Sequence, residues 1–158
     1  MGDERLFADE VGMVLSGMGL PTAFGKLMGW LLICDPPQQT STQLVEALDL
    51  SKGSVSTGMR ALEQLGMVRR VPVRGRGHAY EMLPDALVRT VDARRLYLTI
   101  HDVMQKGIEV LGGDEQLPRA QRLRVTRDFY AFVAKRVPQL IDEFARNEGL
   151  TPHHRRDT

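Results

Sequence analysis

The chain has 158 residues, of which 42% are hydrophobic and 26% charged, values typical of a soluble globular protein. Its 21 lysines and arginines against 20 aspartates and glutamates give a net charge of +1, so the total charge indicates no particular partner. The single cysteine, Cys34, excludes a disulfide framework or a multi-cysteine zinc site within one chain. We expect no metal site and no cofactor.

The N-terminal segment carries charges of both signs and lacks the apolar core of a secretory signal. The longest apolar run, Trp30–Cys34, is far shorter than a membrane span. We therefore expect a cytoplasmic protein that has no membrane partner.

Two helices are predicted at the start of the chain. Apolar residues recur at helical spacing over Glu4–Met18, and again in a segment that begins at Pro21 and is stopped by the Asp-Pro-Pro sequence at 35–37. Gly25 and Gly29 lie on one face of the second helix, where glycine costs helix stability. We interpret them as points of close helix packing.

The next segment predicts a helix-turn-helix. Thr40 and Gln43 match a capping box that opens a short helix, and Ser51 matches the N-cap of a second helix over about 52–65. About three residues, 49–51, join the two helices. In this arrangement the second helix lies in the major groove of DNA, with its N-terminal residues near the base edges.

The polar face of this second helix suits DNA, because no acidic residue interrupts Ser51–Leu62. Arginine, here Arg60, pairs bidentately with guanine, and Ser and Thr hydroxyls bind phosphate oxygens. On an isolated helix such residues would be ordinary surface groups. Between a capped helix and an arginine-rich hairpin, we interpret them as DNA contacts. The predicted contacts here are Thr40, Ser51, Lys52, Ser54, Ser56, Thr57 and Arg60.

A β-hairpin, or wing, is predicted next, from strand signals at 67–73 and 79–83 around the glycine-rich turn 74–77. No Asp or Glu occurs from Gln64 to Tyr80. The stretch contains four arginines, and like charges in one short element repel each other. We therefore interpret these arginines as binding an anionic partner, with the tip of the wing entering a minor groove. The two adjacent arginines alternate faces of a strand, so one is expected to reach phosphate while the other packs against the body. The predicted contacts of the wing are Arg69, Arg70, Arg74, Arg76 and His78.

The rest of the chain is predicted to be helical. Pro84 starts a long helix that ends near Leu111, and a last helical region covers about 115–147, where Pro138 should kink or divide it. Its apolar residues alternate by three and four, a seam of coiled-coil type. The seam consists of Tyr130, Val133, Val137, Leu140 and Phe144.

Several motifs of this sequence resemble the MarR superfamily of winged-helix regulators, and more closely its GbsR-like branch. The resemblance is firm over Phe7–Tyr80 and loose beyond. The wing departs from the family pattern, because Gly77 and His78 follow Arg76 where an acidic residue commonly flanks the wing arginine. The matching motifs are Gly19-Leu20-Pro21, Gly25-Lys26, Gly29-Trp30-Leu31-Leu32, Asp35-Pro36, 44–48, 50–57 and 62–69.

This resemblance implies a mostly α fold with a small β-hairpin wing, that is, a winged helix-turn-helix flanked by dimerisation helices. It implies an effector-responsive repressor that binds double-stranded DNA as a homodimer, with terminal helices pairing and two recognition helices in successive major grooves. The expected domains are an N-terminal dimerisation helix at 1–20, the DNA-binding domain at 21–83, C-terminal helices for dimerisation and effector binding at 84–148, and a disordered tail at 149–158.

The GbsR-like resemblance also suggests that the effector is a choline-type quaternary ammonium compound. Aromatic faces bind such cations. The candidate effector-binding residues are Phe7, Phe24, Trp30 and Tyr97. The alternative is that Phe24 and Trp30 are helix-packing residues.

The residues give less support to two other functions. An enzyme is not expected, because His101 beside Asp102 is accompanied by no nucleophile and no phosphate-binding loop. The main alternative to DNA binding is a winged-helix module that holds another protein, against which the arginines of the wing argue.

Overall fold

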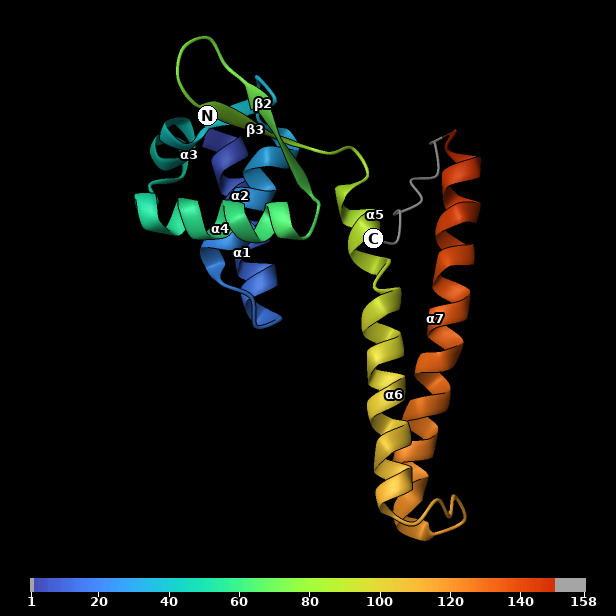
Figure 1. Ribbon diagram of the computed structural model, residues 1–158. Coiled ribbons are helices and arrows are strands. Elements are labelled where there is room, and N and C mark those ends of the chain that lie inside the picture. Colours follow the sequence, from blue (N-terminus) through green and yellow to red (C-terminus); the bar gives the residue numbers. More distant parts are fainter. Residues whose placement is uncertain (1, 150–158) are drawn as a thin grey trace. The chain divides into compact units, whose positions relative to one another are not determined.

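The computed structural model describes residues 2–149, except for the side chain of residue 89 (Figure 1). The chain forms two compact units, one up to Thr90 and one from Val91 onward. Within the described residues no helix is both long and apolar enough to cross a membrane. The tail predicted to be disordered falls, from residue 150 on, outside the described residues.

The first unit combines helices with a small sheet, as the sequence predicted. Its helices are α1 (Gly2–Gly17), α2 (Thr22–Ile33), α3 (Ser41–Leu48) and α4 (Lys52–Gln64), and its strands are β1 (Gln38–Thr40), β2 (Val68–Pro72) and β3 (His78–Met82). A short helix, α5 (Ala86–Val91), follows the sheet and reaches the boundary between the two units.

Helices α1 and α2 cross at unusually close range. A Cβ atom added to Gly25 would lie 2.7 Å from the Cα of Gly12, and one added to Gly29 would lie 2.9 Å from the Cα of Ala8. This confirms the interpretation of Gly25 and Gly29 as packing sites. Ala8 is completely buried, so α1 contributes directly to the core of the first unit.

The helix-turn-helix is built as predicted. The Thr40 hydroxyl accepts a hydrogen bond from the Gln43 N–H (3.2 Å), while the Gln43 side chain accepts one from the Thr40 N–H (2.8 Å), which completes the capping box. Ser51 caps α4, with its Oγ accepting from the Ser54 N–H at 3.1 Å. Asp49, at φ +52°, turns the chain between the two helices.

The sheet has one strand more than the sequence predicted. Its order is β1-β3-β2, all antiparallel, and the register pairs Gln38 with Glu81 and Arg69 with the same Glu81. Strand β1 has three residues and follows two prolines, so it carries no alternation that could reveal it. The wing, β2–β3 with its tip at 73–77, projects beyond the helices of this unit (Figure 1).

The second unit is a hairpin of two long helices, α6 (Arg94–Val110) and α7 (Gln121–Asn147), which lie side by side and antiparallel (Figure 1). The single helix predicted from Pro84 to Leu111 is wrong, because the chain leaves helical geometry at Ala93 (φ −100°, ψ 34°). The Tyr97 hydroxyl donates to the carbonyl of Val91 at 3.0 Å and so satisfies an acceptor at this break.

Helix α7 begins later than predicted, after a turn and the 3₁₀ helix η1 (Pro118–Ala120). Leu117 precedes a proline and is extended (φ −59°, ψ 133°), because the proline ring disfavours helical geometry in the residue before it. Pro138, by contrast, does not divide α7, which runs through it.

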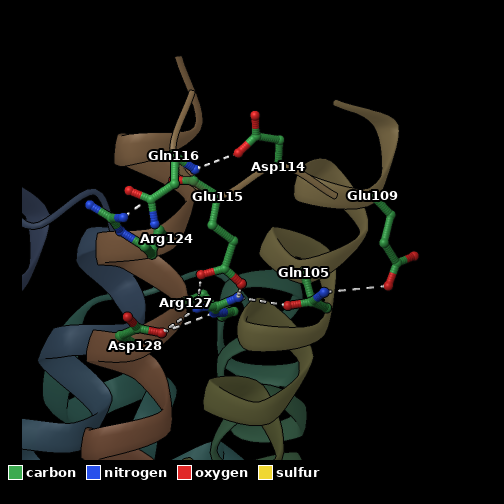
Figure 2. Close-up of polar contacts among 8 residues, drawn as sticks. All are labelled: Gln105, Glu109, Asp114, Glu115, Gln116, Arg124, Arg127 and Asp128. Atoms are coloured by element: carbon green, nitrogen blue, oxygen red, sulfur yellow. Dashed lines mark hydrogen bonds and ion pairs between the residues drawn. The ribbon is translucent and has the colours of Figure 1, made fainter. Parts of the chain in front are cut away.

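A polar cluster fixes the loop between α6 and α7 (Figure 2). Arg127 donates to both carboxylate oxygens of Glu115, at 2.5 and 3.1 Å, and to Gln105 on α6 at 2.9 Å. It also pairs with Asp128 at 2.9 Å. The guanidinium thereby connects the loop to both helices.

The predicted seam of α7 only partly packs against α6. Tyr130 lies beside Tyr97, with ring centroids 6.1 Å apart, and Ala134 is buried. Of the predicted seam, Leu140 and Phe144 are 61% and 46% exposed, and Phe129 and Phe132, outside the seam, are 57% and 62% exposed. A two-helix hairpin has too few surfaces to cover such a set, so the second unit presents an apolar face.

Candidate nucleic-acid interface

One face of α4 is polar, exposed and free of acidic groups. Within residues 2–149, no side-chain hydrogen bond or ion pair engages any of its four exposed members. Their cations and hydroxyls are therefore available to an outside partner. These four are Lys52, Ser56, Thr57 and Arg60.

Three other predicted DNA contacts are used partly by the fold itself. The hydroxyl of Thr40 belongs to the capping box of α3. Ser51 caps α4 and also donates to the Ser54 hydroxyl at 2.9 Å, and Ser54 is half-buried. Capping explains why the sequence has these hydroxyls, so their contribution to DNA contact stays a prediction.

Two of the wing arginines, whose mutual repulsion was interpreted as a sign of an anionic partner, are paired with carboxylates of the fold itself. Arg69 donates its Nε–H to Glu81 at 2.7 Å, and Gln38 donates to the other carboxylate oxygen at 3.0 Å. These hydrogen bonds, chiefly the one from Arg69, hold the pKa of Glu81 below its usual range. Glu81 directly follows the stretch 64–80, which contains no acidic residue. The antiparallel register places Glu81 opposite Arg69.

Arg70 is likewise paired, with Glu63, the residue just before the acid-free stretch 64–80. Its Nε–H and Nη2–H groups donate to the two oxygens of Glu63, on the last turn of α4, at 2.6 and 3.0 Å. The hydrogen bond from Arg70 lowers the pKa of Glu63. The guanidinium carbon also lies 6.0 Å from the ring centroid of Tyr80, at the outer limit of a cation–π contact.

The tip of the wing keeps two arginines without a partner in the described part of the chain. Arg74 and Arg76 are exposed and alternate with Gly75 and Gly77, whose φ angles are +95° and +103°. These positive φ angles suit glycine and allow the tight tip. The cationic surface of the wing is therefore its tip.

His78 is engaged partly by the fold itself. Its ring packs edge-on against Tyr80, with centroids 4.9 Å apart, and its Nε2 is buried with no hydrogen-bond partner. The register places His78 opposite Pro72, in the last pair of the β2–β3 ladder before the wing tip. In this conformation its Nε2 is not available to phosphate, and a DNA contact by the rest of the half-buried His78 side chain stays a prediction.

A cavity of about 730 Å³ lies between α4 and the start of α2. Apolar side chains make most of its wall, among them Leu20, Phe24 and Leu65, and hydroxyls of Ser54 and Thr57 lie at its edge. None of its lining residues carries a charge. It adjoins α4 at two of the predicted DNA contacts, Ser54 and Thr57.

Two of the four aromatic residues suggested for effector binding are core residues. Phe24 and Trp30 are each 7% exposed and belong to the core, where Trp30 donates its Nε1–H to the side chain of Gln39 at 3.3 Å. Phe7 is on α1, and Tyr97 belongs to the second unit. Of the four, Phe24 lines the cavity beside α4.

Comparison with known proteins identifies the family. A family model for MmpR5-like MarR family transcriptional regulators matches residues 85–147. The HTH-type transcriptional regulator MmpR5 of Mycobacterium tuberculosis is 33% identical over 145 residues, which cover 90% of this chain and 87% of the relative. This chain belongs to the MarR family of transcriptional regulators, in its MmpR5-like group.

This MarR family regulator is also similar to a solved structure described as the crystal structure of a transcriptional regulator. The two are 31% identical with a TM-score of 0.79, and the match covers 91% of this chain and 99% of that one. The fold predicted from the sequence, a winged helix-turn-helix with additional helices, is confirmed.

The family assigns DNA-binding transcription regulation to this chain and not enzymatic activity, as predicted. It favours DNA binding over the alternative of a protein-holding module. The matches identify the MmpR5-like group and do not show the GbsR-like branch. The family model matches α5 to α7, the part of this regulator where the sequence motifs were loosest.

Sequence reasoning missed two functional candidates, Glu63 and Glu81. Both are acidic residues just outside the acid-free stretch that contains the arginines of the wing. A hairpin register drawn from the sequence would place Glu81 near Arg69, whereas the Glu63–Arg70 contact depends on how the sheet packs against α4.

Proposed function

We propose that this MarR family regulator binds DNA at two points per protomer. The exposed face of α4 enters the major groove, and the wing tip binds the minor groove or the adjacent backbone. The observation that carries this proposal is that α4 and the wing tip, in one compact unit, present four cations without a partner among residues 2–149: Lys52, Arg60, Arg74 and Arg76. Phosphate attraction and base recognition are thereby divided between two elements.

The experiment is fluorescence anisotropy with DNA from upstream of the regulator's own gene and with a scrambled duplex, at one fixed salt concentration. Arg60→Ala should weaken specific binding by about 1–3 kcal/mol and weaken non-specific binding less, because arginine reads guanine edges only in the right register. Equal affinity of wild type and Arg60→Ala for the specific site would contradict the role given to α4.

We also propose that the regulator is a homodimer that acts as a repressor. The support is the exposed apolar face of α7, together with exposed apolar side chains on α1 such as Met13 and Val14. Burial of such apolar faces against a second copy removes them from water, which is energetically favourable. Two-fold symmetry would duplicate the DNA contacts on a near-palindromic site.

We further propose that a small-molecule effector controls DNA binding. The cavity beside α4 supports this, because a ligand there would touch Ser54 and Thr57. We keep the proposal that the regulator belongs to the GbsR-like branch and binds a quaternary ammonium effector. Of the four aromatic residues suggested for that effector, Phe24 supports the proposal, because it lines this cavity. Calorimetric titration with choline and betaine tests it: heat of binding would support the proposal, and no heat at millimolar concentration would contradict it.

A further inference from the structure

An ion pair joins the two elements that are proposed to touch DNA. Glu63 lies on the last turn of α4, and Arg70 lies in β2, seven positions further along the chain. The contact is bidentate, with distances of 2.6 and 3.0 Å, so it fixes both distance and orientation. We call it the Glu63–Arg70 pair.

Apolar packing in the shared core, which includes Leu62, Val68 and Tyr80, and a short connection also join α4 to the wing. The chain passes from α4 to β2 through a short turn at Gly66, whose φ is +69°. Backbone hydrogen bonds hold the turn, from the Met67 N–H to the Leu62 carbonyl at 3.0 Å and from the Gly66 N–H to the Glu63 carbonyl at 2.9 Å. The Glu63–Arg70 pair is the side-chain link that lies beyond this turn, toward the wing.

The ring of Tyr80 supports the pair from the neighbouring strand. Tyr80 faces Arg70 in the β2–β3 register and is almost fully buried. His78 in turn packs its ring edge-on against Tyr80. The guanidinium of Arg70 is therefore held between a carboxylate and an aromatic face, a geometry that orients it toward α4.

We propose that Glu63 and Arg70 are positioning residues, which set the wing at a fixed angle to the recognition helix so that both bind DNA in register. On this account Arg70 does not bind phosphate. The inference rests on the two-point contact proposed above. Specific binding requires α4 and the wing tip at once, whereas non-specific binding needs only phosphate attraction. Loss of the pair should therefore lower the ratio of specific to non-specific affinity.

This ratio separates positioning from two other roles. A residue that merely stabilised the fold would lower specific and non-specific binding in proportion to the folded fraction, and the ratio would not move. A phosphate contact at Arg70 would change the dependence of affinity on salt, because fewer counterions would be released. Positioning lowers the ratio and leaves the salt dependence as it is.

The test measures specific and non-specific affinities of the full chain over a salt series for Glu63→Gln, Arg70→Gln and the exchanged pair Glu63→Arg with Arg70→Glu. Glu46→Gln is the matched control, because it removes the same charge from an exposed site on α3. Circular dichroism confirms the fold of each variant; Arg70 is 57% exposed and Glu63 24% exposed, so neither lies in the core and all variants are expected to fold.

Glu63→Gln and Arg70→Gln are each expected to lower specific affinity by up to about fivefold, the upper end of the range for a surface ion pair, with the salt slope of the wild type. The decrease in Glu63→Gln is the decisive sign, because removing a negative charge near DNA should otherwise raise affinity, as it should in Glu46→Gln. The exchanged pair should regain at least half of the specific binding that the single variants lack, since it restores the contact with the charges reversed.

Three results would overturn the inference. In the first, Arg70→Gln lowers the salt slope by about one unit per site while Glu63→Gln binds at least as tightly as wild type, which would make Arg70 a phosphate contact. In the second, the exchanged pair binds no better than the single variants. In the third, the wild type binds no DNA, which would remove the two-point contact as well. The first two leave the proposed function standing.

Discussion

At the scale of single residues, the arginines of the wing divide into two pairs with different surroundings. Arg69 and Arg70 are held by Glu81 and Glu63, whereas Arg74 and Arg76 have no partner in the described part of the chain. Charge along the sequence shows all four as one basic stretch. The contact of Arg69 with Glu81 follows from the hairpin register, whereas the contact of Arg70 with Glu63 depends on how the sheet packs against α4.

The two pairs of arginines should therefore respond differently to substitution. Arg76→Ala is expected to weaken specific and non-specific binding and to lower the slope of log affinity against log salt by about one unit for each phosphate that is no longer neutralised. Arg69→Ala, the matched control, should leave the slope unchanged because its guanidinium is engaged by Glu81. Anisotropy titrations from low to high salt measure both slopes. Equal slopes for both variants and wild type would contradict the role given to the tip.

At the scale of the elements, local signals were sufficient for the helix-turn-helix. Thr40, Gln43 and Ser51 cap their helices through hydrogen bonds within three residues, so a short sequence window contains all the participants. Strand β1 and the break at Ala93 escaped prediction. Strand β1 is stabilised by its pairing with β3, and the break lies close to the boundary between the two units. Neither feature is determined by its own residues alone.

The close crossing of α1 and α2 gives a prediction for stability. Gly25→Ala should destabilise the chain by about 1–3 kcal/mol, because its Cβ would lie 2.7 Å from backbone that cannot move without separating the helices. Gly17→Ala, with no atom within 4 Å of its added Cβ, is the control and should be near neutral. Urea unfolding followed by circular dichroism measures both. An unchanged midpoint for Gly25→Ala would show that the helices separate at little cost.

The cluster at the α6–α7 loop predicts a dependence of stability on pH. Hydrogen bonds from Arg127 lower the pKa of Glu115 in the folded chain, below the value of about 4.3 for an unperturbed glutamate. The pair therefore stabilises the fold above that value, and the gain is lost as the pH falls through the folded pKa.

Glu115→Gln tests this dependence. Its melting temperature should lie below that of wild type at neutral pH, and the difference should shrink as the pH falls below about 4.3. Glu109→Gln is the control, since Glu109 has only a 3.5 Å hydrogen bond from Gln105. Thermal unfolding from pH 7 to pH 3 gives the curves. A difference that persists unchanged at the acid end would contradict the ion-pair origin.

At the scale of the whole molecule, each unit leaves apolar side chains exposed that its own helices do not cover. Met13 and Val14 are exposed on α1, and Phe129 and Phe132 on α7. The sequence predicted a seam on α7 from its periodicity, but periodicity alone does not say whether the same chain or a second copy covers it. The proposed homodimer gives these faces a partner.

A substitution in the apolar face of α7 tests the dimer. Phe132→Asp is expected to shift the protein from twice the chain mass to the chain mass, because a carboxylate placed in a buried apolar interface loses its hydration without compensation. Lys135→Ser, also exposed on α7, should leave the dimer intact. Sedimentation velocity at micromolar concentration measures the mass. A Phe132→Asp protein that remains dimeric would exclude this face from the interface.

The central claim is that a symmetric pair of recognition helices and wing tips reads one DNA site. Hydroxyl-radical and methylation-protection footprinting on an operator selected from random DNA tests it most directly. The account predicts two half-sites whose major-groove protections are separated by about one helical turn or a multiple of it, each flanked by minor-groove or backbone protection that disappears in Arg76→Ala. A single protected half-site, or flanking protection that persists in Arg76→Ala, would contradict it.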